Sequence, residues 1–151
     1  MSTIFADKFK NTSGGNNVKV NQLSGIDTAG SITVQGEGTN TTNLQQGLCK
    51  AWVNFTGVSS TAERDSFNIS GLTDEATART TVSYTNNMGN TNYTGSYFQS
   101  GSTGTAVDSY NNQYAGAFTA RTAGNCSVMS HGGSGAIDVA NNDLLIFGDL
   151  A

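Results

Sequence analysis

The chain has 151 residues, of which 36% are hydrophobic and 12% are charged, and its net charge at pH 7 is −4. This length suits one domain with a core of its own, although the charged fraction is only about half of the ~25% that is usual in globular proteins. The sequence has no basic cluster that would neutralise phosphates and no apolar run of the ~18–20 residues that span a bilayer. We therefore expect no nucleic-acid partner and no insertion into a membrane.

The polarity of the chain comes from glycine, asparagine, serine and threonine rather than from charge. Glycine alone accounts for 19 residues, and proline is absent. Threonine favours strands, whereas glycine and asparagine favour the tight turns that join them. The composition therefore predicts a β-rich protein with many short turns.

The first 45 residues carry few large side chains. An apolar patch at Ile4, Phe5 and Phe9 precedes the turn-like segment NTSGGNN, and two thin alternating segments follow it. The apolar positions of these two segments are Val18, Val20, Ile32 and Val34. Two such segments cannot build a core. Residues 1–45 are therefore predicted to form an extended arm or short stalk that needs a neighbour, and residues 46–151 to form the domain.

The opening residues contain no long apolar region and no cleavage-like site, so we expect no signal peptide. Proteins that are not exported usually keep their cysteines reduced, and the spacing of Cys49 and Cys126 matches no metal or redox motif. We expect two free thiols, and a structural bridge between them is the alternative.

The densest apolar stretch of the first half of the chain is GLCKAWVNF, residues 47–55. Alternation with a period of two predicts a strand here. One face of this strand is apolar throughout, and the other carries Lys50, Asn54 and a single large aromatic residue, Trp52. We expect Val53 and Phe55 in the core and Trp52 against the arm or a neighbouring subunit.

The same alternation continues through the rest of the chain. It predicts strands within DSFNIS, ARTTVSYTN, TNYTGSYFQS, QYAGAFTAR, NCSVMSH and NDLLIFGDL, the last being apolar on both faces. The breaks between them, NNMGN, GSTGT, TAGN, HGGSG and ANND, are turn sequences. Helical signals are weak: TNLQQGLCKAW contains Gly47, STAERDS holds one turn at most, and LTDEATART is short and poorly amphipathic.

This pattern predicts an all-β fold, namely an antiparallel, jelly-roll-like β-sandwich with an extended N-terminal arm. Three arms would bury one another's valines, and closed symmetry would protect exposed strand edges, so we predict a homotrimer. The residues expected in the core or at a subunit interface are Trp52, Val53, Phe55, Phe67, Val82, Tyr84, Phe118 and Phe147.

No constellation of residues in the sequence points to catalysis. The single histidine, His131 in SHGGSG, has no fixed acidic neighbour, and no nucleophile-elbow pattern occurs. The acidic residues are scattered, so no carboxylate pair of the glycosidase kind can be named, and no calcium or phosphate loop is matched. We predict that the protein is not an enzyme and has no catalytic residues, cofactor or metal.

Aromatic residues gather in the later half of the chain, at Tyr93, Tyr97, Phe98, Tyr110 and Tyr114. Packing in a core or at a subunit interface is the common use of tyrosine, because its ring is buried while its hydroxyl finds a partner. Stacking of these rings on sugars is the alternative.

Residues 47–98 carry a recognisable succession of motifs, GLCKAWVNFTG and then ERDSFNISGLTDEATARTTVSYTNNMGNTNYTGSYF. This succession resembles the C-terminal domain of tail-fibre and other virion structural proteins of marine bacteriophages. In that family a KAWVNF strand precedes an RDSFN strand, a hairpin and an M…NY segment, and the chain often ends in a strand finishing with FGD. The same FGD stands here at residues 147–149, whereas the family's glycine-containing hairpin turn corresponds to DEATARTTV, which has no glycine.

The resemblance implies a virion structural protein without catalytic residues. The short N-terminal segment fits a capsid-bound role, so we expect a capsid decoration or cement protein or a short head fibre, assembled in the host cytoplasm and displayed on the virion surface. Its expected partners are further copies of the chain and the major capsid protein or another virion protein, with Ile4, Phe5 and Phe9 as the attachment patch.

Two other functions are weighed against this one. The first is a tail-fibre tip that binds a host cell-surface glycan through the loops GSTGTAVDSYNN and RTAGNC and through exposed tyrosines. The second is a polysaccharide-degrading spike, for which the sequence offers no identifiable carboxylate pair.

Overall fold

The computed structural model describes residues 22–23, 32–36, 38–100, 115–132 and 135–151. The chain divides into two units, residues 1–43 and residues 44–151. The predicted boundary after residue 45 lies near this division.

In the first unit the structure describes a short antiparallel hairpin. β1 (Thr33–Gln35) pairs with β2 (Thr41–Asn43), and Gly38 in the connecting loop has a positive φ of 90°. No side chain of either strand is fully buried, and Val34 is 50% exposed. A two-stranded hairpin is only marginally stable in water by itself, so this one needs contacts from elsewhere to persist.

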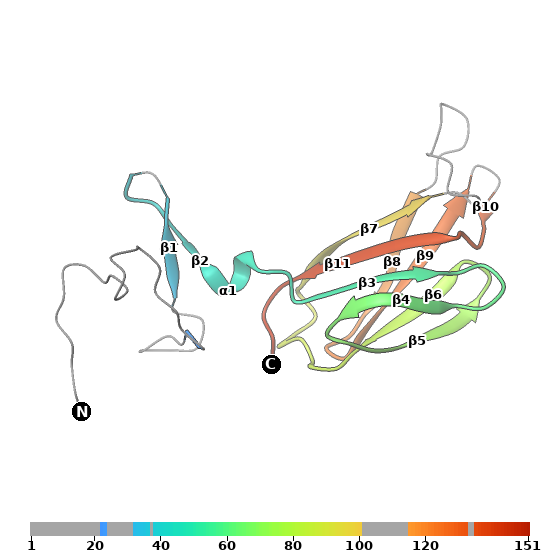
Figure 1. The fold of residues 1–151 in the computed structure, drawn as a ribbon, viewed down its shortest axis with the longest axis horizontal. Coiled ribbons are helices and arrows are strands. Elements are labelled where there is room, and N and C mark those ends of the chain that lie inside the picture. The colour runs from blue at the N-terminus through green and yellow to red at the C-terminus, as the bar shows by residue number, and fades with distance from the viewer. Residues whose placement is uncertain (1–21, 24–31, 37, 101–114, 133–134) are drawn as a thin grey trace, which may run out of the picture. The chain divides into compact units, whose positions relative to one another are not determined.

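The second unit is built from two antiparallel sheets (Figure 1). The four-stranded sheet has the order β4 (Ala62–Phe67), β3 (Ala51–Thr56), β11 (Asn141–Phe147) and β7 (Thr94–Ser100). The other sheet has the order β10 (Gly135–Ala136), β9 (Asn125–Gly132), β6 (Arg79–Tyr84) and β5 (Ile69–Ala76), and β8 (Ala115–Arg121) also pairs with β9. A single helical turn, α1 (Leu44–Gly47), precedes β3. The prediction of an all-β fold with antiparallel sheets is confirmed.

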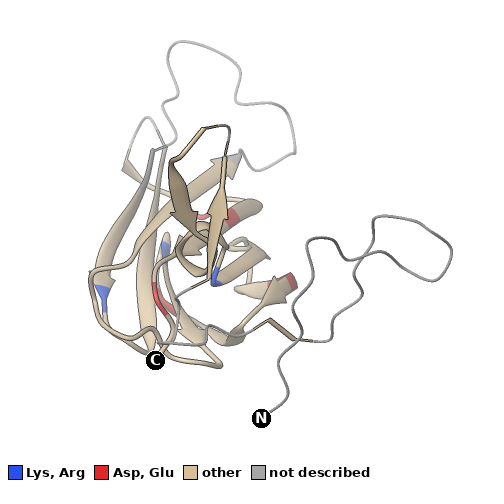
Figure 2. Ribbon diagram, turned by 90° about the vertical axis from the view of Figure 1, so that its left-hand side faces the viewer, with Lys and Arg blue, Asp and Glu red and all other residues tan. Residues whose placement is uncertain are grey.

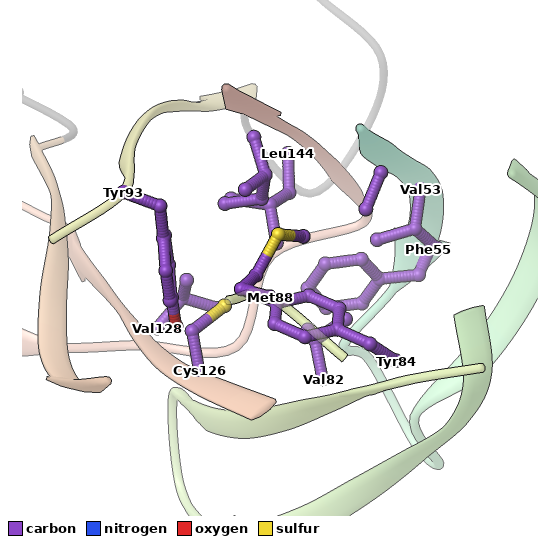
Figure 3. Close-up of a cluster of buried hydrophobic side chains, with 11 residues drawn as sticks. Val53, Phe55, Val82, Tyr84, Met88, Tyr93, Cys126, Val128 and Leu144 are labelled. Carbon is purple, nitrogen blue, oxygen red and sulfur yellow. The ribbon is translucent and has the colours of Figure 1, made fainter. Parts of the chain in front are cut away.

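Side chains from both sheets form one buried cluster (Figure 3). Burial alternates along β3, β6 and β11, because successive residues of a strand point to opposite faces. Val53 and Phe55 of β3 and Val82 and Tyr84 of β6, all predicted for the core or an interface, belong to this cluster. Phe118 of β8 is half-buried and packs against it.

The segment DSFNIS is not the single strand that its alternation predicted. β4 ends at Phe67 in one sheet and β5 begins at Ile69 in the other, with Asn68 between them at a φ of 60°. The side chain of Asn68 holds this change of direction: its Oδ1 accepts a hydrogen bond from the N–H of Asn86 (2.7 Å), and its Nδ2 donates to the carbonyl of Lys50 (3.0 Å). Asparagine tolerates positive φ, which alternation alone does not reveal.

The weak helical signals after β3 are wrong as well. STAERDS lies largely in β4, and LTDEATART forms the β5–β6 hairpin, whose turn contains Ala78 at a φ of 66°. This turn lacks glycine, and neighbouring groups hold it instead. The N–H of Ala78 donates to Oδ1 of Asp138 (2.6 Å), and its carbonyl accepts from the N–H of Ser130 (2.8 Å).

The segment ANND, expected to be a turn, lies mostly in β11. Asn142 is buried there because its polar groups are paired. Its Nδ2 donates to the carbonyl of Val139 (3.0 Å), and its Oδ1 accepts from the hydroxyl of Tyr97 (2.5 Å). Tertiary hydrogen bonds therefore override the usual preference of asparagine for turns.

Candidate functional site

One face of the four-stranded sheet points away from the buried cluster and carries a row of apolar side chains. The register pairs Trp52 of β3 with Phe67 of β4 on one side and with Leu145 of β11 on the other. Directly opposite residues of neighbouring strands point to the same face, so the three side chains lie side by side across three strands. We refer to Phe67, Trp52 and Leu145 as the apolar row.

The chain's own residues cover the apolar row only in part. Phe67 is 53% exposed, while Trp52 and Leu145 are half-buried. Phe67 is therefore not a core residue, because it pairs with Trp52 on the outer face of the sheet rather than sharing an inner face with Ile69. Phe147, also predicted for the core or an interface, is half-buried on the same face of β11 as Leu145.

Leu145 was not singled out from the sequence. The only signal for it is that NDLLIFGDL is apolar at successive positions, so that β11 has apolar residues on both faces. A strand covered on one side only would normally carry polar residues on the other.

A polar row borders the apolar row on the same face. The register brings Asp65 of β4, Asn54 of β3 and Asp143 of β11 opposite one another. Asn54 Nδ2 donates to Asp143 Oδ1 (2.6 Å), while Arg64 donates to Asn54 Oδ1 (3.3 Å) and to the carbonyl of Ala140 (2.6 Å). These bonds order the polar side chains, so the apolar row lies beside a strip with two carboxylates. Charged positions are otherwise sparse along the strands (Figure 2).

A shallow polar pocket of about 300 Å³ lies within the second unit. The residues that line it are Gln46, Asn90, Asn92, Tyr93, Thr94, Phe147, Gly148 and Asp149. Asn90 Oδ1 accepts a hydrogen bond from the N–H of Asn92 (2.7 Å), which orders one wall. Amide and carboxylate groups beside an aromatic ring suit a small polar ligand.

Burial favours the neutral forms of one cysteine and three tyrosines of the second unit. Burial raises the pKa of the Cys126 thiol to about 11, and it raises the pKa values of Tyr84, Tyr93 and Tyr97 above the usual value for tyrosine. A buried thiol with a raised pKa is unreactive at neutral pH. Cys49 and Cys126 are both free cysteines, so the alternative of a bridge between them is not observed.

The structure also places the single histidine and the side chains that could bind a metal ion. His131 lies on β9, and its backbone carbonyl accepts a hydrogen bond from Gln99 Nε2 (3.1 Å). Among the residues that the structure describes, no group of three or more histidine, cysteine or acidic side chains is placed to hold a metal ion.

Two of the later aromatic residues, Tyr93 and Tyr97, are not placed to stack on sugars. Tyr93 is buried, with its hydroxyl donating to the carbonyl of Asn125 (2.9 Å), and Tyr97 is half-buried against the core. Phe98 is 59% exposed. Tyr110 and Tyr114, like the predicted attachment residues Ile4, Phe5 and Phe9, lie outside the described residues.

Comparison of the chain with protein-family models, with curated proteins and with solved structures gives no match in any of the three. In the described part of the chain, no helix has the length and apolar character needed to cross a membrane.

Proposed function

We propose that the chain is a non-enzymatic structural protein of a bacteriophage virion, displayed on the capsid surface as a decoration or cement protein or a short head fibre. It acts as a homotrimer and attaches to the major capsid protein or another virion protein through Ile4, Phe5 and Phe9. Two features support this: the motif succession of residues 47–98 and an interaction surface on the second unit.

The apolar row is the observation that carries this proposal. An isolated monomer leaves Phe67 largely exposed and Trp52 and Leu145 partly exposed. Contiguous exposed apolar side chains on a folded protein commonly mark an interaction surface. The β1–β2 hairpin gives independent support, because it has no fully buried side chain and needs a neighbour.

We also infer that the two sheets are the layers of a β-sandwich with jelly-roll-like connections. Two features support this: side chains of both sheets share one cluster, and the chain passes between the sheets repeatedly, from β4 to β5, β6 to β7, β7 to β8 and β10 to β11. The hairpins β3–β4, β5–β6 and β8–β9 depart from a strict jelly roll, because each keeps consecutive strands in one sheet.

The capsid role is tested on particles of the phage that encodes the chain. Antibodies against the purified protein should label the heads of these particles in immuno-electron microscopy, and light scattering should give three times the chain mass of 15.6 kDa. Deleting residues 1–10 should abolish binding to capsids while leaving the thermal unfolding of the second unit unchanged. Label absent from intact particles, or capsid binding retained by the deletion variant, would contradict the proposal.

A second candidate function, a tail-fibre tip that binds a host cell-surface glycan, is favoured by the polar pocket. Amides, the carboxylate of Asp149 and the ring of Phe147 are groups that sugars use for hydrogen bonding and stacking. In this case the purified protein should bind a glycan array. Asn92→Ala should then weaken binding, while Thr73→Ala, an exposed position on β5 outside the pocket, should leave it unchanged.

A further inference from the structure

We propose that the apolar row is the docking surface for residues 16–23 of a second copy of this chain. This inference rests on the homotrimer proposed above, and it names the surface and the segment through which two copies meet.

The segment has the composition that this surface requires. Residues 16–23 read NNVKVNQL, and in an extended chain Val18 and Val20 point to the same face. Packed on Trp52 and Phe67, these valines would remove apolar surface from water on both partners. The segment contains no proline, so its backbone is also compatible with a strand.

Charge favours the same pairing. Lys8, Lys10 and Lys19 flank or lie within the segment, with no acidic residue between them. The second unit has more acidic than basic residues, and its polar row places Asp65 and Asp143 beside the apolar row, with one guanidinium, that of Arg64, bonded to the same row. The polar row therefore keeps a net negative charge. Opposite charges of this kind steer two partners together and select against self-pairing of the acidic face.

The connecting chain is long enough to reach another copy. The β1–β2 hairpin returns the chain to Asn43, opposite Thr33, so the reach comes from residues 24–32. From Leu23 to Thr33 an extended chain spans up to ~35 Å, against a diameter of ~30 Å for a small domain. The β1–β2 hairpin lies within this connection, where contacts between copies would cover its exposed side chains.

Trp52 is the only tryptophan of the chain, so its fluorescence reports directly on the apolar row. In a dilution series of the full-length protein, light scattering should show dissociation to monomers, and the Trp52 emission should shift to longer wavelength over the same concentrations. Phe67→Ser should weaken association about tenfold, as the loss of a buried aromatic contact implies. Phe98→Ser is the matched control, because Phe98 is 59% exposed on β7 of the same sheet but lies outside the apolar row.

Cross-linking identifies the segment and the copy that supplies it. A chain with Val20→Cys mixed with a chain with Phe67→Cys should give a covalent two-chain product under mild oxidation, and the unsubstituted protein, whose Cys126 is buried and Cys49 half-buried, should not. A cross-link that forms only within a chain carrying both substitutions would show that the segment covers its own sheet and would overturn the inference.

The two proposals fail in distinguishable ways. A trimer in which Phe67→Ser behaves like Phe98→Ser overturns the docking surface and leaves the trimer standing. A monomer at every concentration overturns the homotrimer and the docking between copies together.

Discussion

Gly95 on β7 allows a close approach of neighbouring strands, and Gly95→Ala is expected to destabilise the second unit strongly. A Cβ atom at this position would lie 2.5 Å from the carbonyl oxygen of Leu145, 2.7 Å from Cζ of Phe118 and 2.8 Å from Cδ1 of Ile146. Real Cβ atoms essentially never show contacts under 3.0 Å, so at least one neighbour must move.

The shortest of these contacts is with a backbone atom, and this determines how much stability the substitution removes. Residues 94–100 of β7 pair with residues 141–147 of β11 in a continuous antiparallel register, so the Leu145 carbonyl cannot retreat without shifting a strand. Overpacking a core costs ~1–3 kcal/mol, and we expect the upper end here, ~3 kcal/mol. For a unit of this size, that loss corresponds to a decrease in melting temperature of roughly 13 °C.

Thermal and urea denaturation of the full-length protein, followed by circular dichroism, measure this effect. Gly71→Ala on β5 is the matched control, since a Cβ atom there meets no heavy atom within 4 Å. A compatible glycine-to-alanine change stabilises by ~0.4–1 kcal/mol because it restricts the unfolded chain, so the two variants should shift stability in opposite directions. Equal melting temperatures for the two variants would refute the close approach at Gly95.

Three further predictions concern buried polar groups and a strained turn. Asn68→Ala should lower the free energy of unfolding, measured by urea denaturation, by ~2–4 kcal/mol, because it removes side-chain hydrogen bonds and places alanine at positive φ. Asn68→Gly should lower it by about 1 kcal/mol less, because glycine accepts positive φ. Equal losses for the two variants would show that φ does not matter. Tyr84→Phe should be neutral or stabilising, because the buried hydroxyl of Tyr84 has no hydrogen-bond partner among the described residues. Tyr93→Phe loses the bond to the carbonyl of Asn125 and should lower the free energy of unfolding by ~1 kcal/mol. A lower melting temperature for Tyr84→Phe than for Tyr93→Phe would contradict this assignment. The free energy of unfolding should fall as pH rises from about 9, the usual pKa of a thiol, through about 11, the pKa of Cys126 in the folded protein. In this window the Cys126 thiol ionises readily in the unfolded chain but not in the folded protein. Cys126→Ala should make this alkaline loss, of order 2–3 kcal/mol, smaller, and an unchanged pH dependence would exclude Cys126 as its source.

The alternation of apolar and polar residues was sufficient to predict strands that have one buried face. In residues 51–56 the alternation of apolar and polar side chains reports the buried face of β3 directly, because a strand in a two-sided environment has a period of two. The same reasoning places Val82 and Tyr84 in the core, and Gly47 limits the helical signal before β3 to one turn. The sequence by itself therefore determined the β class and the buried faces of β3 and β6.

Only the tertiary structure decided where strands end, which sheet each joins and which faces remain outside. Alternation continues unbroken across Asn68, yet hydrogen bonds from distant backbone groups turn the chain there and move Ile69 to the other sheet. Phe67 consequently lies beside Trp52 on an outer face. On the other side of Trp52 lies Leu145, whose strand is distant in the sequence from both. Period-two patterning identifies two faces of a strand but not the neighbour that covers each, because burial is a property of the assembled sheets rather than of any one segment.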